Sequence, residues 1–197
     1  MSKKKNIIIL MLVLVLLIVG ASVLYTQLSK NDNPDNLLIK GEEDKNNSEN
    51  QNDKTVEEQR LTKAPDFTVF DVSGEKVNLS DFLGKPVVLN FWASWCGPCQ
   101  SEMPDFHKKY LELGDEIHFL MVNMTGGRET LNSAKAFISE KGYTFPVFYD
   151  TDYNAATTYS VYSLPTTYFI DAEGFLIAQA TGAISLDTLQ KGIDMIK

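Results

Sequence analysis

The amino-acid sequence predicts an α/β domain, in which helices flank a mixed sheet, behind a single N-terminal helix that spans a membrane. Two nearly continuous apolar runs, 87–92 and 117–122, are typical of strands that are buried on both faces of a sheet. A helical segment at 96–113 lies between them, and this strand–helix–strand order indicates a right-handed parallel crossover. A third apolar run, 7–25, is long enough to cross a bilayer.

The N-terminal run follows three consecutive lysines at 3–5 and contains no charged residue. Its nineteen residues would span roughly 28 Å as a helix, close to the ~30 Å hydrocarbon core of a bilayer. We therefore predict a cytoplasmic segment (1–6) and an uncleaved transmembrane signal anchor (7–25), with the rest of the chain outside the cytoplasm. A cleaved signal peptide is the alternative, because the small residues at 20–22 form a weak cleavage site.

Residues 26–60 have the composition of a disordered acidic linker. The stretch 31–60 contains nine acidic and four basic residues, no aromatic residue, and few large apolar residues other than Leu37, Leu38 and Ile39. Such a segment buries too little apolar surface to offset the conformational entropy lost on folding. The net charge of −8 for the whole chain also argues against nucleic acid and anionic lipid surfaces as partners.

The elements of the predicted domain, residues 61–197, follow from alternation and turn signals. Residues 66–71 and 76–79 alternate polar and apolar side chains around Ser73-Gly74, which predicts a β-hairpin. A short turn at 80–86 leads into the first buried strand. The remaining predicted elements are helices at 130–141, 154–159 and 185–196, with Ser185 as the cap of the last one, and strands at 146–149, 167–170 and 176–179.

Cys96 and Cys99 are the only cysteines of the chain, and only Gly97 and Pro98 separate them. A disulfide between them would close a very small loop, and such a loop contributes little stability by restricting the unfolded chain. The pair is therefore predicted to be a redox couple rather than a structural crosslink. Zinc is the alternative, but the chain has no second cysteine pair, and its only histidines are His107 and His118. His118 is predicted to lie within a strand, so the four ligands of a structural zinc site are not in place. We predict neither a metal nor a cofactor.

The position of the pair explains why one thiol would be reactive. Cys96 comes where the buried strand ends and the helix begins, so unpaired backbone N–H groups and the positive end of the helix dipole favour a thiolate there. Pro98 suits a first helical turn, and Gly97 adds no bulk above the sulfur. Cys96 is thus predicted to be the exposed nucleophile, and Cys99, one turn into the helix, the resolving thiol.

Residues 87–104, VVLNFWASWCGPCQSEMP, resemble the active-site segment of the thioredoxin superfamily. The hairpin before this segment, the helix inserted at about 129–141 and the late motif LPTTYFID (164–171) are similar to its TlpA/ResA-like branch, which is membrane-anchored and extracytoplasmic. The resemblance covers roughly residues 64–197. It implies a thioredoxin fold with a central mixed sheet, an extra N-terminal β-hairpin and an inserted helix.

The resemblance also implies roles for individual residues. Cys96 and Cys99 match the redox-active dithiol, and Trp95 matches the aromatic residue beside it. Pro165 matches the proline that this family keeps in the cis form next to the disulfide, where the preceding backbone is left free to pair with a substrate strand.

Two positions concern the movement of protons. Thioredoxin has a buried aspartate six residues before the first cysteine, whereas this chain has Asn90, which can only form hydrogen bonds. Relatives in the branch use a glutamate after the strand that corresponds to 117–123, and Glu129 is the nearest candidate. The alternative is that Glu129 is an acid in the first turn of the next helix, where it would interact favourably with the helix dipole. Both interpretations stay open at this point.

The dipeptide Gly-Pro between the cysteines is that of reducing thioredoxin, whose potential is roughly −270 mV. This favours a thiol-disulfide oxidoreductase that reduces protein disulfides outside the membrane, with apocytochrome c, an oxidised methionine sulfoxide reductase or other envelope proteins as clients. A membrane electron donor of the thiol-transporting type would recharge it. The alternatives are a disulfide-donating oxidase on the same fold and a non-catalytic binding module. A peroxidase is disfavoured, because Arg128 is the only arginine after the cysteines.

Overall fold

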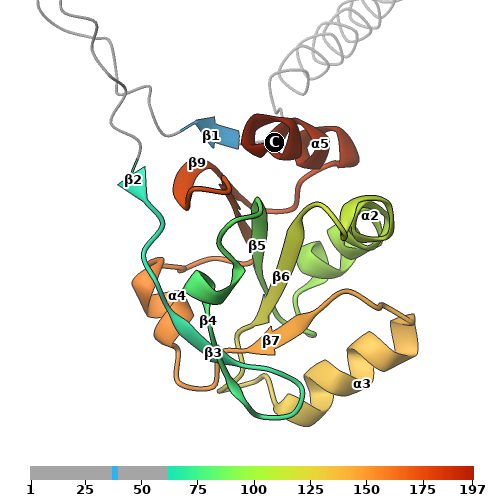
Figure 1. Ribbon diagram of the computed structural model, residues 1–197. Coiled ribbons are helices and arrows are strands. Elements are labelled where there is room, and N and C mark those ends of the chain that lie inside the picture. Colours follow the sequence, from blue (N-terminus) through green and yellow to red (C-terminus); the bar gives the residue numbers. More distant parts are fainter. Residues whose placement is uncertain (1–36, 40–61) are drawn as a thin grey trace, which may run out of the picture. The chain divides into compact units, whose positions relative to one another are not determined.

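The computed structural model of the protein describes residues 37–39 and 62–197 (Figure 1). All of them belong to one unit, Asp35–Lys197. No helix within these residues has the length and apolar content that a membrane span requires. The predicted cytoplasmic segment (1–6) and signal anchor (7–25) lie outside the described residues.

The described strands form one mixed sheet in the order β1-β9-β8-β5-β6-β7-β3-β4, and β2 also pairs with β9. The strands are β1 (Leu37–Ile39), β2 (Thr62–Lys63), β3 (Thr68–Phe70), β4 (Lys76–Asn78), β5 (Val87–Trp92), β6 (His118–Asn123), β7 (Val147–Tyr149), β8 (Thr166–Ile170) and β9 (Phe175–Thr181). The helices are the 3-10 helix η1 (Leu79–Phe82), α2 (Gly97–Leu113), α3 (Leu131–Lys141), α4 (Asn154–Thr158) and α5 (Leu186–Ile196).

Strand β5 lies at the centre of the sheet and positions the cysteines. It pairs in parallel with β6 on one side and antiparallel with β8 on the other. Because β5 and β6 are parallel, α2 forms the crossover between them that the sequence predicts. Strand β6 in turn pairs in parallel with β7, and α3 connects these two strands. The predicted hairpin is also confirmed, because β3 and β4 pair antiparallel around the turn at Gly74. The sheet is mixed, as in the thioredoxin-like fold that the resemblance implies.

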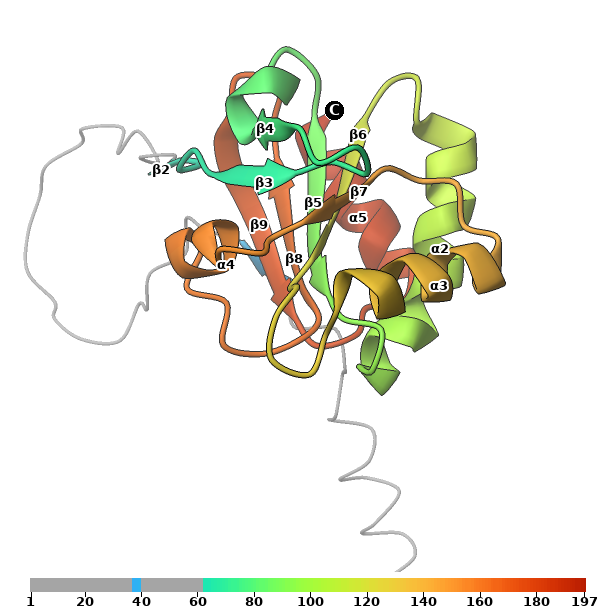
Figure 2. The same ribbon diagram turned by 90° about the horizontal axis from the view of Figure 1, so that it is seen from below.

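Helices cover both faces of the sheet (Figure 2). Helices α2, α3 and α5 pack on one face, where Val88 and Trp92 of β5 join their apolar side chains. Helix α4 and η1 pack on the other face against Leu89 and Phe91. Since side chains alternate along a strand, Asn90 lies on the same face as Val88 and Trp92, toward α2. This parity places a polar side chain beneath the helix that carries the cysteines.

One segment of the predicted linker differs from the prediction. Leu37–Ile39, which lie within the expected disordered stretch 26–60, form strand β1 and pair with Ala178–Ala180 of β9. Strand β9 would otherwise present unpaired backbone groups along this edge, and an added strand satisfies them. These three residues are also the apolar cluster of an otherwise polar segment. The prediction of disorder was therefore wrong at this point.

Candidate active site

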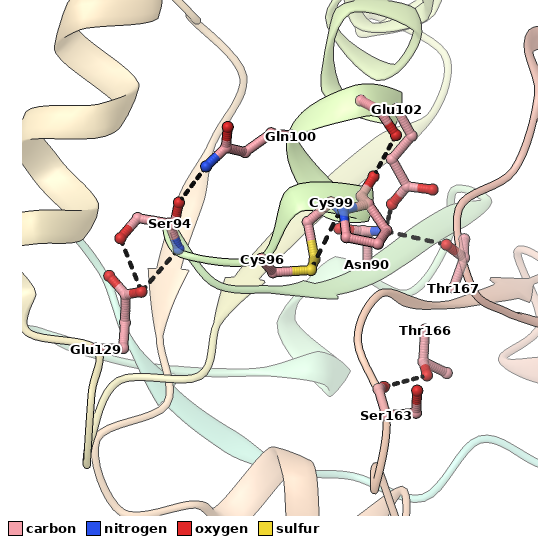
Figure 3. Close-up of a disulfide and its surroundings, with 12 residues drawn as sticks. Asn90, Ser94, Cys96, Cys99, Gln100, Glu102, Glu129, Ser163, Thr166 and Thr167 are labelled. Carbon is pink, nitrogen blue, oxygen red and sulfur yellow. Dashed lines mark hydrogen bonds between the residues drawn. A yellow bond between two sulfur atoms is a disulfide. The ribbon is translucent and has the colours of Figure 1, made fainter.

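A disulfide joins Cys96 and Cys99 at the N-terminal end of α2, with an S–S distance of 2.04 Å (Figure 3). Cys96 is the N-cap of the helix, and its Sγ accepts a hydrogen bond from the backbone N–H of Cys99 at 3.2 Å. Gly97 and Pro98 occupy the first turn, where the missing N–H of proline leaves no helical hydrogen bond unmade. The predicted placement of the pair, where β5 passes into α2, is confirmed.

The two cysteines differ in access. Cys99 is completely buried, and Cys96 is only 4% exposed, so the prediction that Cys96 is an exposed residue was too strong. A cavity of about 490 Å³ lies in front of the disulfide. Cys96 lines this cavity together with Trp95, Tyr162 and Leu164, among others, whereas Cys99 does not. A molecule in the cavity would therefore meet Cys96 first.

The loop between β5 and α2 is fixed through both backbone groups of Ser94. Its N–H donates to Oε2 of Glu129 at 2.7 Å, and its side-chain hydroxyl donates to the same oxygen at 2.9 Å. Its carbonyl oxygen accepts a hydrogen bond from Nε2 of Gln100 at 2.6 Å. Glu129 is buried, and its other carboxylate oxygen accepts from the Ser133 hydroxyl at 3.0 Å. The segment that leads into Cys96 is thus held from two directions.

Asn90 connects β5 to α2 beneath the disulfide. Its Nδ2 donates to Oε1 of Glu102 at 2.8 Å and to Oγ1 of Thr167 at 3.0 Å (Figure 3). Thr167 is the cross-strand partner of Asn90 on β8, which explains the second contact. Among the described residues, Oδ1 of Asn90 has no hydrogen-bond partner although it is buried. Asn90 therefore acts as a hydrogen-bonding group, as expected for a side chain that cannot titrate.

Glu102 is a candidate functional residue that sequence reasoning missed. It lies on α2 three residues after Cys99 and is 2% exposed. Its Oε1 accepts from Asn90, and its Oε2 accepts from the backbone N–H of Ile184 at 2.9 Å. Burial raises the pKa of Glu102 to about 7, although the hydrogen bonds from Ile184 and Asn90 oppose this shift. A carboxyl group that titrates near neutral pH thus lies on the buried side of α2, next to the redox couple.

The loop before β8 forms another wall of the site. The Leu164–Pro165 peptide bond is cis, as the resemblance implies. Pro165 accepts a hydrogen bond from the N–H of Gly182 at 2.9 Å, and Ser163 accepts one from the Thr166 hydroxyl at 2.8 Å. Within the described residues, the backbone N–H and C=O of Leu164 make no hydrogen bond, and Leu164 lines the cavity beside Cys96. Unpaired backbone groups therefore border the space in front of the disulfide.

Comparison with known proteins identifies the family. Residues 61–179 match the AhpC/TSA family. The chain belongs to this family. Thioredoxin-like protein YneN of Bacillus subtilis is 36% identical over 142 residues, which cover 72% of this chain and 83% of that protein. Thiol-disulfide oxidoreductase ResA of Bacillus thuringiensis is 39% identical over 130 residues, which cover 64% of this chain and 72% of that protein.

A solved structure agrees with these relatives. The pneumococcal exposed lipoprotein thioredoxin Etrx1 from Streptococcus pneumoniae aligns with a TM-score of 0.58 and 35% identity, over 66% of this chain and 99% of that one. The AhpC/TSA member described here therefore has a thioredoxin-like fold and is a thiol-disulfide oxidoreductase, as the resemblance of its active-site segment predicted.

In this AhpC/TSA protein, Glu129 does not occupy the first turn of α3. Thr130 is the N-cap of that helix, and Glu129 precedes it, so the alternative of a first-turn acid was wrong. The carboxylate of Glu129 is instead engaged by Ser94 and Ser133, two groups that hold the loop before Cys96. Its hydrogen bonds are thus directed at the loop rather than at the cysteines.

A signal for Glu102 exists in the sequence. The buried side chains of α2 include Cys99, Met103 and Phe106, which are spaced at i, i+4 and i+7. Glu102, at i+3, falls within this stripe, where an acidic residue requires hydrogen-bond partners inside the fold. An acid on the buried face of the helix that carries the cysteines is the pattern that could have identified it.

The raised pKa of Glu102 predicts a pH-dependent stability. Because the native pKa (about 7) lies above the ordinary 4.5, the native state binds more protons than the unfolded state between these values. The free energy of unfolding of the oxidised protein should therefore fall as pH rises through this window, by an amount on the order of 3 kcal/mol. Urea unfolding at several pH values measures it. Glu102→Gln should remove this dependence of the unfolding free energy on pH. Glu112 is an exposed acid on the same helix, and Glu112→Gln should retain the dependence. Parallel profiles for Glu102→Gln and the wild type would contradict the assignment of the pKa to Glu102.

Glu129 should stabilise the loop before Cys96. In Glu129→Ala the part-buried N–H of Ser94 loses its acceptor, and we expect the free energy of unfolding to fall by about 1–3 kcal/mol. Glu140→Ala, at an exposed acid of α3, is the control and should change little. If Glu129 only positions the loop, the pH midpoints of the rate of thiol-disulfide exchange should be the same in Glu129→Ala and the wild type. A shifted midpoint with unchanged stability would instead support a proton relay through Glu129.

Proposed function

We propose that this oxidoreductase is a membrane-anchored, extracytoplasmic reductase of protein disulfides that works through the Cys96–Cys99 couple. The observation that carries the proposal is the asymmetry of the pair. Cys96 lines a cavity at the N-terminus of α2, while Cys99 is buried behind it, on the helix that also carries Glu102. Cys96 is placed to react with a client disulfide, and Cys99 is placed to attack the resulting mixed disulfide and release the client.

In the proposed reaction, the thiolate of reduced Cys96 attacks a disulfide of the client. A mixed disulfide forms between Cys96 and one client sulfur, and the other client sulfur leaves as a thiolate that takes up a proton. The thiolate of Cys99 then attacks Sγ of Cys96 and releases the second client thiol. Two electrons pass from the dithiol to the client, and the Cys96–Cys99 disulfide that the structure contains is the product.

The second step requires Cys99 to lose its proton inside the protein. We assign this acid–base role to Glu102, because it is buried one turn further along α2 and its pKa of about 7 allows both protonation states near neutral pH. Asn90 holds the carboxyl group in place through Nδ2. Glu129 is assigned a positioning role through Ser94.

The surroundings of Cys96 support an extended client segment. The free backbone groups of Leu164, next to cis-Pro165, are available to pair with a client strand. A Cβ atom added at Gly97 would meet nothing within 4 Å, so the space above the first turn is open. Trp95 is 45% exposed at the rim of the cavity and offers an aromatic surface. These groups would orient a client disulfide toward Cys96.

The direction and the location of the reaction are inferred from the sequence. The Gly-Pro dipeptide favours a reducing couple, and the predicted anchor at 7–25 favours a site outside the cytoplasm. A membrane electron donor of the thiol-transporting type would then return electrons to the disulfide. Oxidised apocytochrome c, methionine sulfoxide reductase and misoxidised envelope proteins are the proposed clients. A disulfide-donating oxidase is the second candidate, since the same residues can run the exchange in reverse.

The redox equilibrium distinguishes the two directions. For a reductase, we expect the Cys96–Cys99 couple of the full-length protein to equilibrate with glutathione at a potential nearer to thioredoxin's roughly −270 mV than to the roughly −120 mV of a strong oxidant. Quenching with an alkylating reagent and counting the modified thiols measures the reduced fraction. A potential near −120 mV would reject the reductase.

Cys99→Ser should trap clients on Cys96. Without the resolving thiol the mixed disulfide cannot be released, so covalent complexes that dithiothreitol dissolves should accumulate on the full-length protein. Cys96→Ser is the matched control, and it should trap little because Cys99 is completely buried. The complexes are detected by non-reducing electrophoresis and identified by mass spectrometry. Absence of complexes with Cys99→Ser, together with unchanged activity, would favour the non-catalytic binding module.

A further inference from the structure

A tight turn, Gly126–Glu129, is fastened to the loop before Cys96. Gly126 and Glu129 exchange backbone hydrogen bonds, both of 2.9 Å, so that Gly127 and Arg128 form the tip of the turn. The carboxylate of Glu129 holds Ser94. The guanidinium of Arg128 lies over the ring of Trp95, with 4.5 Å between its central carbon and the ring centroid. The turn therefore delivers an arginine to the residue next to Cys96.

The turn also contacts a second wall of the cavity. A Cβ atom at Gly126 would lie 2.2 Å from the hydroxyl of Tyr153, and φ at this position is +148°. At this φ a larger residue would be strained, and its side chain would displace the ring of Tyr153, so glycine suits the position. Tyr153 lines the cavity and is 40% exposed, and Tyr162, on the same wall, is 94% exposed. Trp95, Tyr153 and Tyr162 thus border the space in front of Cys96, with Arg128 at their edge.

The charge of Arg128 has no counter-charge in the part of the chain that the structure describes. The ion pairs there are Lys109–Glu112 and Lys197–Glu116. The neighbouring carboxylate, that of Glu129, is used by Ser94 and Ser133. Arg128 is exposed, and when its flat face rests on an indole its N–H groups stay available at the edge for a planar anion. It is also the only arginine within residues 62–197.

We infer that Arg128 is a specificity-determining residue that binds a carboxylate of the client segment, next to the client's disulfide cysteine. An apolar side chain of the same segment would enter the cavity between Trp95 and Tyr162. This inference rests on the proposed function, since it concerns the substrate of the same site. Charge complementarity supports this inference: a guanidinium without an ion-pair partner among the described residues lies over Trp95, the residue before Cys96, in a chain of net charge −8, so a negatively charged segment is selected there.

The test uses two disulfide-linked peptides that are identical except for Asp or Lys beside one cysteine. The reduced full-length protein in detergent is mixed with each peptide, and the second-order rate constant of reduction is measured. We expect the Asp peptide to react about fivefold faster than the Lys peptide at low salt, with the ratio falling as salt is added. Arg128→Gln should bring the ratio close to one, and Arg128→Glu should invert it.

Two further variants separate charge from other effects. Arg128→Lys keeps the charge and should keep a preference for the Asp peptide. Lys141→Gln removes the same charge at the far end of α3, where Lys141 also lies over an aromatic ring, and should keep the wild-type ratio. The pKa of Cys96, followed by thiolate absorbance, gives a readout that a specificity role does not move.

The outcomes are distinguishable. A wild-type protein that reduces both peptides at equal rates overturns the inference and leaves the proposed function intact. Equal slowing of both peptides by Arg128→Gln, together with a raised Cys96 pKa, also overturns it, because Arg128 would then act on the thiolate and not on the client. Failure to reduce any peptide, with oxidation of dithiol peptides by the disulfide form instead, rejects the proposed function itself.

Discussion

A carboxyl group inside the apolar face of α2 is the constraint on which the site depends. Glu102 shares that face with Met103 and Phe106, where an isolated charge would be strongly unfavourable. Its two oxygens are satisfied by Asn90 of β5 and by the backbone of Ile184, just before α5. These bonds fix the position of α2 relative to the central strand and to the last helix. The disulfide lies at the N-terminal end of α2. The hydrogen bonds that position Glu102 therefore also position the two cysteines.

A second carboxylate fixes the site from the opposite side, in a different environment. Glu129 is buried as well, but it receives three hydrogen bonds, from the N–H and hydroxyl of Ser94 and from the hydroxyl of Ser133. The cost of removing a carboxylate from water is offset more completely when several donors point at it. Glu102 has one donor on each oxygen, and burial raises its pKa to about 7. These two environments are the basis for the different tasks that we propose for the two acids, proton exchange for Glu102 and positioning of the loop for Glu129.

The parts of the molecule that local sequence signals specify were predictable, and the long-range contacts were not. Strand β5, helix α2 and the β3–β4 hairpin follow from apolar runs, an N-terminal proline and a turn. The placement of Cys96 and Cys99 follows from these elements.

The hydrogen bond between Glu102 and Ile184 joins residues 82 positions apart, and no periodicity in the sequence encodes it. The hydrogen bond between Glu129 and Ser94 likewise depends on how the turn 126–129 packs against the loop before Cys96. The cis form of Pro165 was expected from resemblance alone, because a sequence does not by itself specify the isomer. Strand β1 formed where the composition predicted disorder, since the edge of β9 supplied backbone hydrogen-bond partners that composition does not reveal.

The turn that carries Glu129 also explains how an acidic protein can attract an acidic client. The net charge of −8 creates a repulsive field, but at physiological salt that field is screened beyond about 8 Å. What a client segment meets at the cavity is decided by the groups within contact distance, and there the unpaired charge is Arg128, resting on Trp95. The carboxylate of the neighbouring Glu129 is hydrogen-bonded to Ser94 and Ser133 and, within the described residues, forms no ion pair with that guanidinium. The same residue thus orders the loop before Cys96 and leaves the arginine beside it free, so that the rigidity of the reacting sulfur and the selection of its client depend on one turn of the chain.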